Sequence, residues 1–237
     1  MSNALHPALD ERKWSWQMRA EIGSLGVAFL LTFSSFLLLP PRDAFSIILK
    51  VLLLMVSGAT LLAAFFAYRR YREALPSIAR KLSDKTEAWA RLTYTRGFFR
   101  LRDPPLLLRV VLTRGSGGRG KGPEPYFVAD LTFYLPKIAV SYIALRSSWH
   151  NGVKIETERS ESDKAVADRL VEVAGSLTKA LKCDVEVRTK MSRIYDPISR
   201  SYKKAEATVT LRRVPLSKLT VAVKTVEDIV RLLRHKA

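Results

Sequence analysis

The chain has 237 residues, of which 48% are hydrophobic, and its 40 Lys and Arg against 22 Asp and Glu give a formal net charge of +18. A charge of this sign attracts phosphate-bearing surfaces and acidic proteins. Cys183 is the only cysteine, which excludes an intrachain disulfide and a zinc site built from cysteines.

The positive charge is concentrated in the later part of the chain. Residues 1–68 contain five basic and four acidic side chains, whereas residues 69–237 contain 35 basic and 18 acidic ones. Glutamine and asparagine are scarce, with Gln17 the only glutamine and Asn3 and Asn151 the only asparagines. Depletion of these thermolabile side chains is typical of heat-adapted proteins, so we expect a thermophilic source.

Two long apolar runs follow the first 21 residues, which we expect to form a cytoplasmic N-terminal tail. Residues 22–41 contain no charged side chain, and residues 44–68 contain only Lys50. About 20 apolar residues suffice for a helix to cross the roughly 30 Å hydrocarbon layer. The linker between the runs is too short for a domain, so residues 22–68 are predicted to form a transmembrane helical hairpin. The alternatives are two buried helices of a large soluble core and a cleaved signal peptide, but no A-x-A-like cleavage site follows the first run.

The flanks of these runs predict the orientation of the hairpin. Arg69, Arg70 and Arg72 follow the second run, whereas the turn between the runs offers only Arg42. Because cytoplasmic flanks are enriched in Lys and Arg, we expect a multi-pass protein of the cell (inner) membrane with both termini in the cytoplasm. Neither run contains Asp, Glu or His, which argues against an ion-coupled transporter.

Small residues recur every four positions in both runs. Such spacing allows helix backbones to approach closely in lipid, and packing within the hairpin is favoured over a dimer interface. The candidate packing residues are Ser24, Ala28, Ala59, Ala63 and Ala67.

Residues 69–103 are predicted to form a basic amphipathic segment next to the membrane. Pro76 is expected to end the membrane helix because a proline inside a helix costs about 3 kcal/mol. Apolar residues then recur at helical spacing from Leu75 to Leu92. This segment either lies on anionic lipid headgroups or packs against the following domain, and the pattern favours neither. The candidate contacts to an anionic surface are Arg69, Arg70, Arg72, Arg80 and Lys81.

Residues 104–237 show the patterns of a basic cytoplasmic α+β domain. A helix of about 20 residues is predicted from a capping-box-like start at Ser160 to Leu181, and residues 217–235 are interpreted as one helix, with a strand followed by a shorter helix as the alternative. This order favours a mainly antiparallel sheet of about six strands with two helices on one face. The predicted strands, which alternate in polarity, are at 107–113, 127–135, 138–149, 153–157, 185–191 and 205–211.

A glycine-rich stretch at 114–125 resembles two nucleotide-binding patterns in its spacing. Gly115 to Lys121 fits G-x-x-x-x-G-K, but Gly122 stands where a Ser or Thr hydroxyl is needed for magnesium. Pro123 and Pro125 then disfavour the helix whose N-terminus would hold the phosphates. We therefore predict a flexible hairpin loop rather than a nucleotide site, with Arg114, Arg119 and Lys121 as candidate contacts to an anionic surface.

No catalytic residue, metal site, cofactor or small-molecule substrate is predicted. Metal sites need clustered ligands, and the three histidines are far apart in the sequence. Five tyrosines, among them Tyr195 and Tyr202, lie near basic residues, but without an RNP1 sequence we expect ordinary strand faces rather than an RNA-binding sheet.

The leading functional hypothesis is a non-enzymatic scaffold or accessory subunit in the membrane that presents its basic domain to an acidic protein partner or anionic lipid. The alternatives are a membrane tether for RNA or ribosomes and an enzyme with an unrecognised site.

Overall fold

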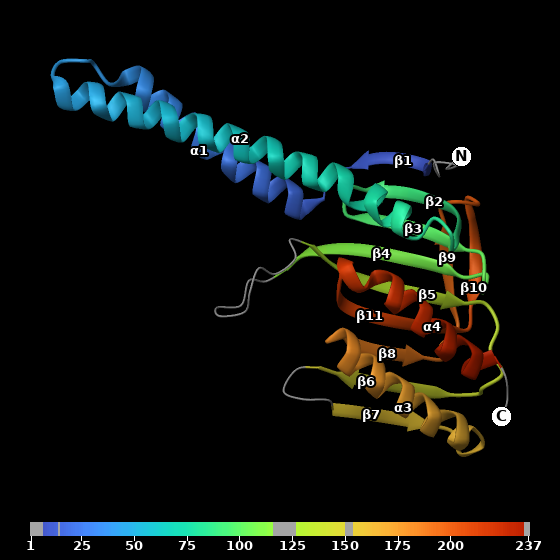
Figure 1. The fold of residues 1–237 in the computed structure, drawn as a ribbon. Helices are drawn as coiled ribbons and strands as arrows, with labels where there is room; N and C mark the ends of the chain where they lie inside the picture. The colour runs from blue at the N-terminus through green and yellow to red at the C-terminus, as the bar shows by residue number, and fades with distance from the viewer. Residues whose placement is uncertain (1–6, 14, 116–126, 150–153, 235–237) are drawn as a thin grey trace. The chain divides into compact units, whose positions relative to one another are not determined.

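The computed structural model describes residues 7–13, 15–115, 127–149 and 154–234 (Figure 1). It divides into two compact units, one of residues 13–76 and one of residues 1–12 with 77–237. In chain order, the elements are β1 (Pro7–Lys13), α1 (Trp16–Leu38), α2 (Ala44–Lys81), β2 (Thr86–Thr93), β3 (Arg96–Leu101), β4 (Leu107–Arg114), β5 (Phe127–Leu135), β6 (Ile143–Ser148), β7 (Lys154–Arg159), η1 (Glu161–Asp163), α3 (Lys164–Leu181), β8 (Asp184–Arg188), β9 (Ser192–Asp196), β10 (Ser201–Ala205), β11 (Ala207–Pro215), η2 (Leu216–Lys218) and α4 (Leu219–Arg234).

The first unit contains α1 and most of α2, which are both long and apolar enough to cross a membrane. The most apolar window of α1 has none of its residues buried, and that of α2 has 6% buried. A core helix of a soluble protein buries its apolar stripe, whereas Leu31 and Phe45 are 65% and 73% exposed. This exposure supports membrane association.

Polar contacts within this unit join the two helices. The hydroxyl of Tyr71 on α2 donates a 2.8 Å hydrogen bond to Glu21 Oε2 on α1. Lys50 Nζ lies 5.3 Å from the centroid of the Phe36 ring. The ammonium group of Lys50 therefore has an aromatic partner on the neighbouring helix.

Pro76 does not end the membrane helix as expected. Helix α2 continues through it to Lys81. The division between the two units nevertheless falls between Pro76 and Ser77. Proline has no N–H to donate to the carbonyl four residues earlier, so the intrahelical ladder has a gap at this position.

The second unit is built on a nine-stranded sheet with the order β1-β2-β3-β4-β5-β11-β8-β6-β7, and β9 and β10 form a separate two-stranded sheet. The pairings from β2 through to β7 are all antiparallel. The α+β class and the mainly antiparallel sheet are thus confirmed. The predicted count of about six strands is wrong, because residues 86–215 alone contribute eight strands to the main sheet and two to the hairpin.

Residues 86–101 account for two of the additional strands. The helical spacing that continued through Trp89 and Leu92 was misleading, since the helix ends at Lys81 and the chain then forms β2 and β3. Trp89 is 2% exposed and stacks on Phe99, its cross-strand neighbour, with ring centroids 5.6 Å apart. Pairing across the strands therefore determines the structure of this segment.

Helices α3 and α4 cover one face of the sheet, as predicted (Figure 1). Residues 219–234 form a single helix, α4, which was the preferred interpretation. A row of side chains, each at most 1% exposed, crosses six strands and forms the centre of the core. In order of pairing, the row is Phe99, Leu108, Phe133, Val209, Val187 and Leu145.

The opposite face of the sheet is polar because successive side chains of a strand point to opposite faces. The residues next to this row on β4, β5 and β11 are Arg109, Thr132 and Thr210, and these three are neighbours across the strands. Glu186 on β8 continues this row. Each of the four is only half-buried.

Candidate functional site

The β9–β10 hairpin has two chemically different faces. Tyr195 pairs with Tyr202, and Arg193 pairs with Lys204. Because side chains alternate along a strand, these four residues share the outer face of the hairpin. The other face, here called the inner face, carries Ile194, Asp196, Ser201 and Lys203.

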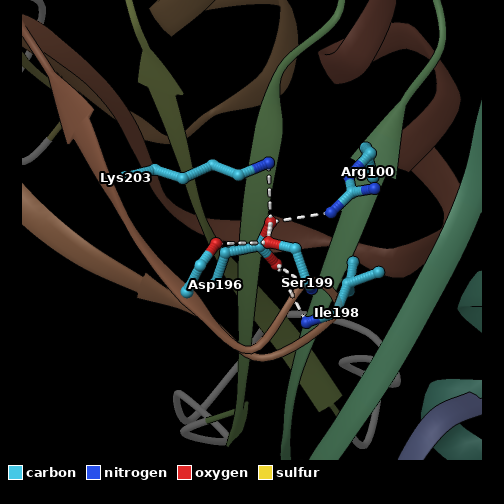
Figure 2. A network of polar contacts seen from close by, with 6 residues as sticks. Arg100, Asp196, Ile198, Ser199 and Lys203 are labelled. Carbon is cyan, nitrogen blue, oxygen red and sulfur yellow. Dashed lines mark hydrogen bonds and ion pairs between the residues drawn. The ribbon is translucent and has the colours of Figure 1, made fainter.

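A fully buried carboxylate holds the inner face to the main sheet. Asp196 Oδ2 accepts hydrogen bonds from Arg100 Nη2 at 2.8 Å and from Ser199 Oγ at 2.7 Å. Lys203 Nζ lies 2.9 Å from the same oxygen (Figure 2). Arg100 belongs to β3, so the contact joins the hairpin to the central part of the sheet. Buried charges in proteins need such partners.

The local sequence explains why the chain turns here. Asp196 Oδ1 accepts from the backbone N–H groups of Ile198 at 2.9 Å and Ser199 at 3.4 Å, which is the Asx-turn contact that favours Asp at the start of a turn. Arg200 then adopts φ of 52°, in the left-handed region. The same carboxylate therefore closes the turn and anchors it.

These contacts decide the protonation state of Asp196. Burial alone would raise the pKa of the carboxyl, because it disfavours the charged form. The hydrogen bonds from Ser199, Lys203 and Arg100, with that from the Ile198 N–H, outweigh burial and hold the pKa well below its ordinary value. Asp196 is therefore an anion at neutral pH.

The outer face combines exposed aromatic rings with positive charge. Tyr195 is 45% and Tyr202 76% exposed, and their ring centroids lie 5.4 Å apart in an edge-to-face arrangement. Arg193 and Lys204 lie beside them and are also exposed. Residues 192–205 contain four basic side chains and one acidic side chain, Asp196, which is buried on the other face. The outer face is thus a small basic and aromatic surface.

The predicted juxtamembrane cations are exposed, and Arg69 and Lys81 are examples that contact other residues of the chain. Arg69 Nε pairs with Glu73 Oε1 at 3.0 Å, one turn along α2. Lys81 Nζ donates to the carbonyl of Leu216 at 3.1 Å. Arg70, Arg72 and Arg80 are likewise exposed on α2. The ion pair of Arg69 and Glu73 is exposed, and exposed i,i+4 pairs are weak. The charge of Arg69 therefore stays accessible to solvent.

The predicted loop residues are described only in part. Arg114 is the last residue of β4 and is exposed. Arg119 and Lys121 lie outside the described residues.

The predicted small packing residues of the apolar helices differ in burial. Ala67 is 5% exposed, whereas Ala59 and Ala63 are exposed, as is Ser24. Ala28 is half-buried. Ser57, which is 2% exposed, shows that the packed face of α2 runs through position 57 rather than through 59 and 63.

Asp130 and Cys183 are two further residues whose surroundings the structure describes. Asp130 Oδ1 accepts a 2.8 Å hydrogen bond from the backbone N–H of Arg213, where the register of β11 shifts against β5. Cys183 is 2% exposed. Burial, with the nearby charge of Asp184, raises the pKa of its thiol to about 12, although Lys218 acts in the opposite direction. Within the described residues, no group of three or more His, Cys, Asp or Glu is placed to hold a metal ion.

Comparison with known proteins gives no match: no family model fits the chain, and no curated protein or solved structure is similar to it at a level that indicates relationship. We therefore infer function from the residues of this chain. Sequence reasoning considered Tyr195 and Tyr202 only as members of a scattered set of five tyrosines. The missed signal was their spacing around the Asp196 to Arg200 turn, which makes them cross-strand neighbours.

Proposed function

We propose that the protein is a non-enzymatic adaptor, anchored in the cell membrane by α1 and α2, whose basic domain recruits an acidic protein partner in the cytoplasm. The observation that carries this proposal is the outer face of the β9–β10 hairpin. Tyrosine and arginine are the residues most enriched at energetically important positions of protein interfaces. Here Tyr195, Tyr202 and Arg193 share one exposed face on a hairpin that Arg100 and Asp196 tie to the sheet.

The charge balance supports an acidic partner. Residues 69–237 carry 35 basic and 18 acidic side chains, so their field attracts a negatively charged surface over a distance of about 10 Å at moderate salt. Such a field accelerates encounter and excludes basic competitors. Tyr195 and Tyr202 would then make apolar contacts with the partner, in addition to the electrostatic attraction.

In the proposed orientation, the turn at residues 39–43 lies outside the cell and the basic domain lies inside. Arg69, Arg70 and Arg72 would then contact anionic headgroups at the cytoplasmic surface, each at about 1 kcal/mol. The orientation is tested by single-cysteine labelling. In a Cys183→Ser background, Arg42→Cys should react with a membrane-impermeant reagent added outside intact cells, and Lys224→Cys should react only after lysis. The reverse pattern would overturn the orientation.

Photo-crosslinking from the hairpin tests the partner. The full chain is expressed in its native membrane with a benzophenone amino acid at position 202. The control carries it at position 142, where Tyr142 is 44% exposed immediately before β6. We expect a discrete, protease-sensitive adduct with one acidic protein from position 202 and none from position 142.

A matched pair of charge reversals provides the specificity control. Arg193→Glu with Lys204→Glu should abolish the adduct, whereas Lys179→Glu with Lys224→Glu, on α3 and α4, changes the net charge equally and should retain it. Equal loss in both double variants would show that only overall charge matters. An adduct that is absent from position 202, or that contains a basic protein, would contradict the proposal.

The second candidate is a membrane tether for RNA. It is favoured by the two exposed rings beside cations, because bases stack on aromatic side chains at about 1–3 kcal/mol each while cations contact the backbone. The test uses the full chain in nanodiscs of neutral lipid with a fluorescent oligouridine over a salt series. Three phosphate contacts predict a log–log slope of roughly −2, and Tyr195→Ala should weaken binding about tenfold. Binding that is insensitive to Tyr195→Ala would exclude this use of the hairpin.

A further inference from the structure

A cavity of about 220 Å³ lies beneath the inner face of the β9–β10 hairpin. Its floor comes from the main sheet and the loop before β4, and its cover comes from the hairpin. The apolar walls are formed by Pro105, Leu106, Leu107, Tyr134, Pro136 and Ile194. The cavity brings together residues from five strands, β3, β4, β5, β9 and β10, and Lys204 of the outer face also contributes to its lining.

The charged part of the lining carries an excess of positive charge. Arg100 and Lys203 both contact Asp196 Oδ2, so two cations share one carboxylate. Lys204 also lines the cavity and lies 3.5 Å from Glu206 Oε1. No second carboxylate of the described residues enters the Arg100 and Lys203 cluster. A guanidinium has five N–H donors. Arg100 donates to Asp196 through Nη2. Its other N–H groups can therefore donate to a further anion.

We propose that this cavity binds a small amphipathic monoanion, a carboxylate with a short alkyl group. The carboxylate would pair with Arg100 and Lys203 and bring the cluster to electroneutrality, and the apolar group would lie against Leu106, Leu107 and Ile194. This proposal is distinct from the adaptor function, because it rests on Arg100 and Lys203 rather than on the outer-face tyrosines, although Lys204 of the outer face also lines the cavity.

The size of the cavity limits the ligand. Drug-sized ligands occupy pockets of roughly 300–1,000 Å³, so this cavity accepts a smaller molecule. At roughly 30 Å³ for each water-sized group, it has room for about seven non-hydrogen atoms. Pentanoate, with five carbons and two oxygens, matches this size and the required chemistry.

Binding of pentanoate to the full chain in nanodiscs of neutral lipid tests the proposal. The measurement is ligand-observed NMR, with dissociation constants from titration. We expect a dissociation constant near 1 mM, which corresponds to about −4 kcal/mol. Acetate, which lacks the apolar group, and pentylamine, which has the wrong charge, should each bind at least tenfold more weakly.

Three variants connect binding to the cavity. Ile194→Trp should fill the cavity and abolish binding, and Lys203→Gln should weaken binding about tenfold while Arg100 still holds Asp196. Lys224→Gln, on α4, makes the same charge change away from the cavity and should have no effect. Cooperative unfolding of each variant confirms that it is folded.

Several results would overturn the proposal. One is the absence of pentanoate binding up to about 20 mM, which is well above the expected dissociation constant. Another is equal binding of pentanamide, because a neutral ligand would show that the cations are not involved. Binding that survives in Ile194→Trp would place pentanoate elsewhere on the protein. None of these results affects the crosslinking test of the adaptor function.

Discussion

Arg100 Nη2 on β3 donates to Asp196 Oδ2 on β9 at 2.8 Å, across 96 positions of sequence. The carboxylate is fully buried, and the arginine side chain is 26% exposed. This contact attaches the small β9–β10 hairpin to the main sheet. Both the outer face of the hairpin and the cavity beneath its inner face depend on it.

Removal of the arginine should therefore destabilise the hairpin. Arg100→Met retains the aliphatic bulk but removes a hydrogen bond to a charged group, which costs about 1.5–3 kcal/mol. Urea unfolding of the full chain in detergent micelles, with amide exchange of residues 192–205, measures the effect. Arg193→Met, on the outer face of the same hairpin, should change stability by about 0.5 kcal/mol or less. Equal effects of the two variants would show that the Asp196 contact is not the anchor.

The depressed pKa of Asp196 predicts acid sensitivity. A carboxyl with a lower pKa in the folded state stabilises the protein above its unfolded pKa of about 3.9. That stability is lost as the pH falls below about 4 toward the folded pKa, because the native carboxylate must then be protonated. Asp196→Asn should be less stable at pH 7 but show a shallower decline between about pH 4 and pH 2. Parallel pH profiles of the two proteins would contradict this assignment.

A buried hydroxyl pair between α3 and β6 predicts a coupled effect on stability. Thr178 Oγ1 donates to Ser147 Oγ at 2.8 Å, and both residues are fully buried. Thr178→Val keeps the shape but leaves the Ser147 hydroxyl without this partner, at a cost of about 1–3 kcal/mol. Adding Ser147→Ala should recover part of the loss, because it removes the stranded hydroxyl. A double-mutant cycle by urea unfolding gives the coupling, and strict additivity would refute it.

The single cysteine predicts slow thiol chemistry in the folded protein. With a pKa raised to about 12, Cys183 carries roughly a thousandfold less thiolate at pH 8 than a free cysteine. A disulfide reagent should therefore react rapidly only after unfolding in guanidinium. A variant with Lys224→Cys supplies an exposed reference thiol in the same molecule. Two thiols that react at one rate in the native state would show that Cys183 is accessible.

The elements with strong periodic patterns could be predicted from the sequence. The two apolar runs are helices because about 20 successive apolar residues have no strand-like alternation. Helices α3 and α4 follow from apolar residues at helical spacing, such as Leu170 and Leu177, and both of these are buried. Strands β4 and β5 follow from period-two alternation, which their burial reproduces almost without interruption.

Segments with disturbed patterns could not be predicted in this way. The register of β2 against β3 shifts near Thr86 and again near Arg91, so its buried positions do not alternate regularly. A bulge removes the period of two on which a strand prediction depends. The apolar residues of this segment then matched a helix by chance, although cross-strand stacking of Trp89 and Phe99 determines the structure.

The composition, the apolar runs and the periodic patterns by themselves determined a basic α+β domain that follows two membrane-length helices. Only the tertiary structure decided where function is to be sought. In the sequence, Arg100 is one of 40 basic residues and Asp196 one of 22 acidic residues. Their contact requires β3 and the β9–β10 hairpin to meet in space, and no local pattern encodes a pairing across 96 positions. The cavity and the tyrosine surface arise from that long-range contact, because it holds the hairpin in place and gives it an inner and an outer face.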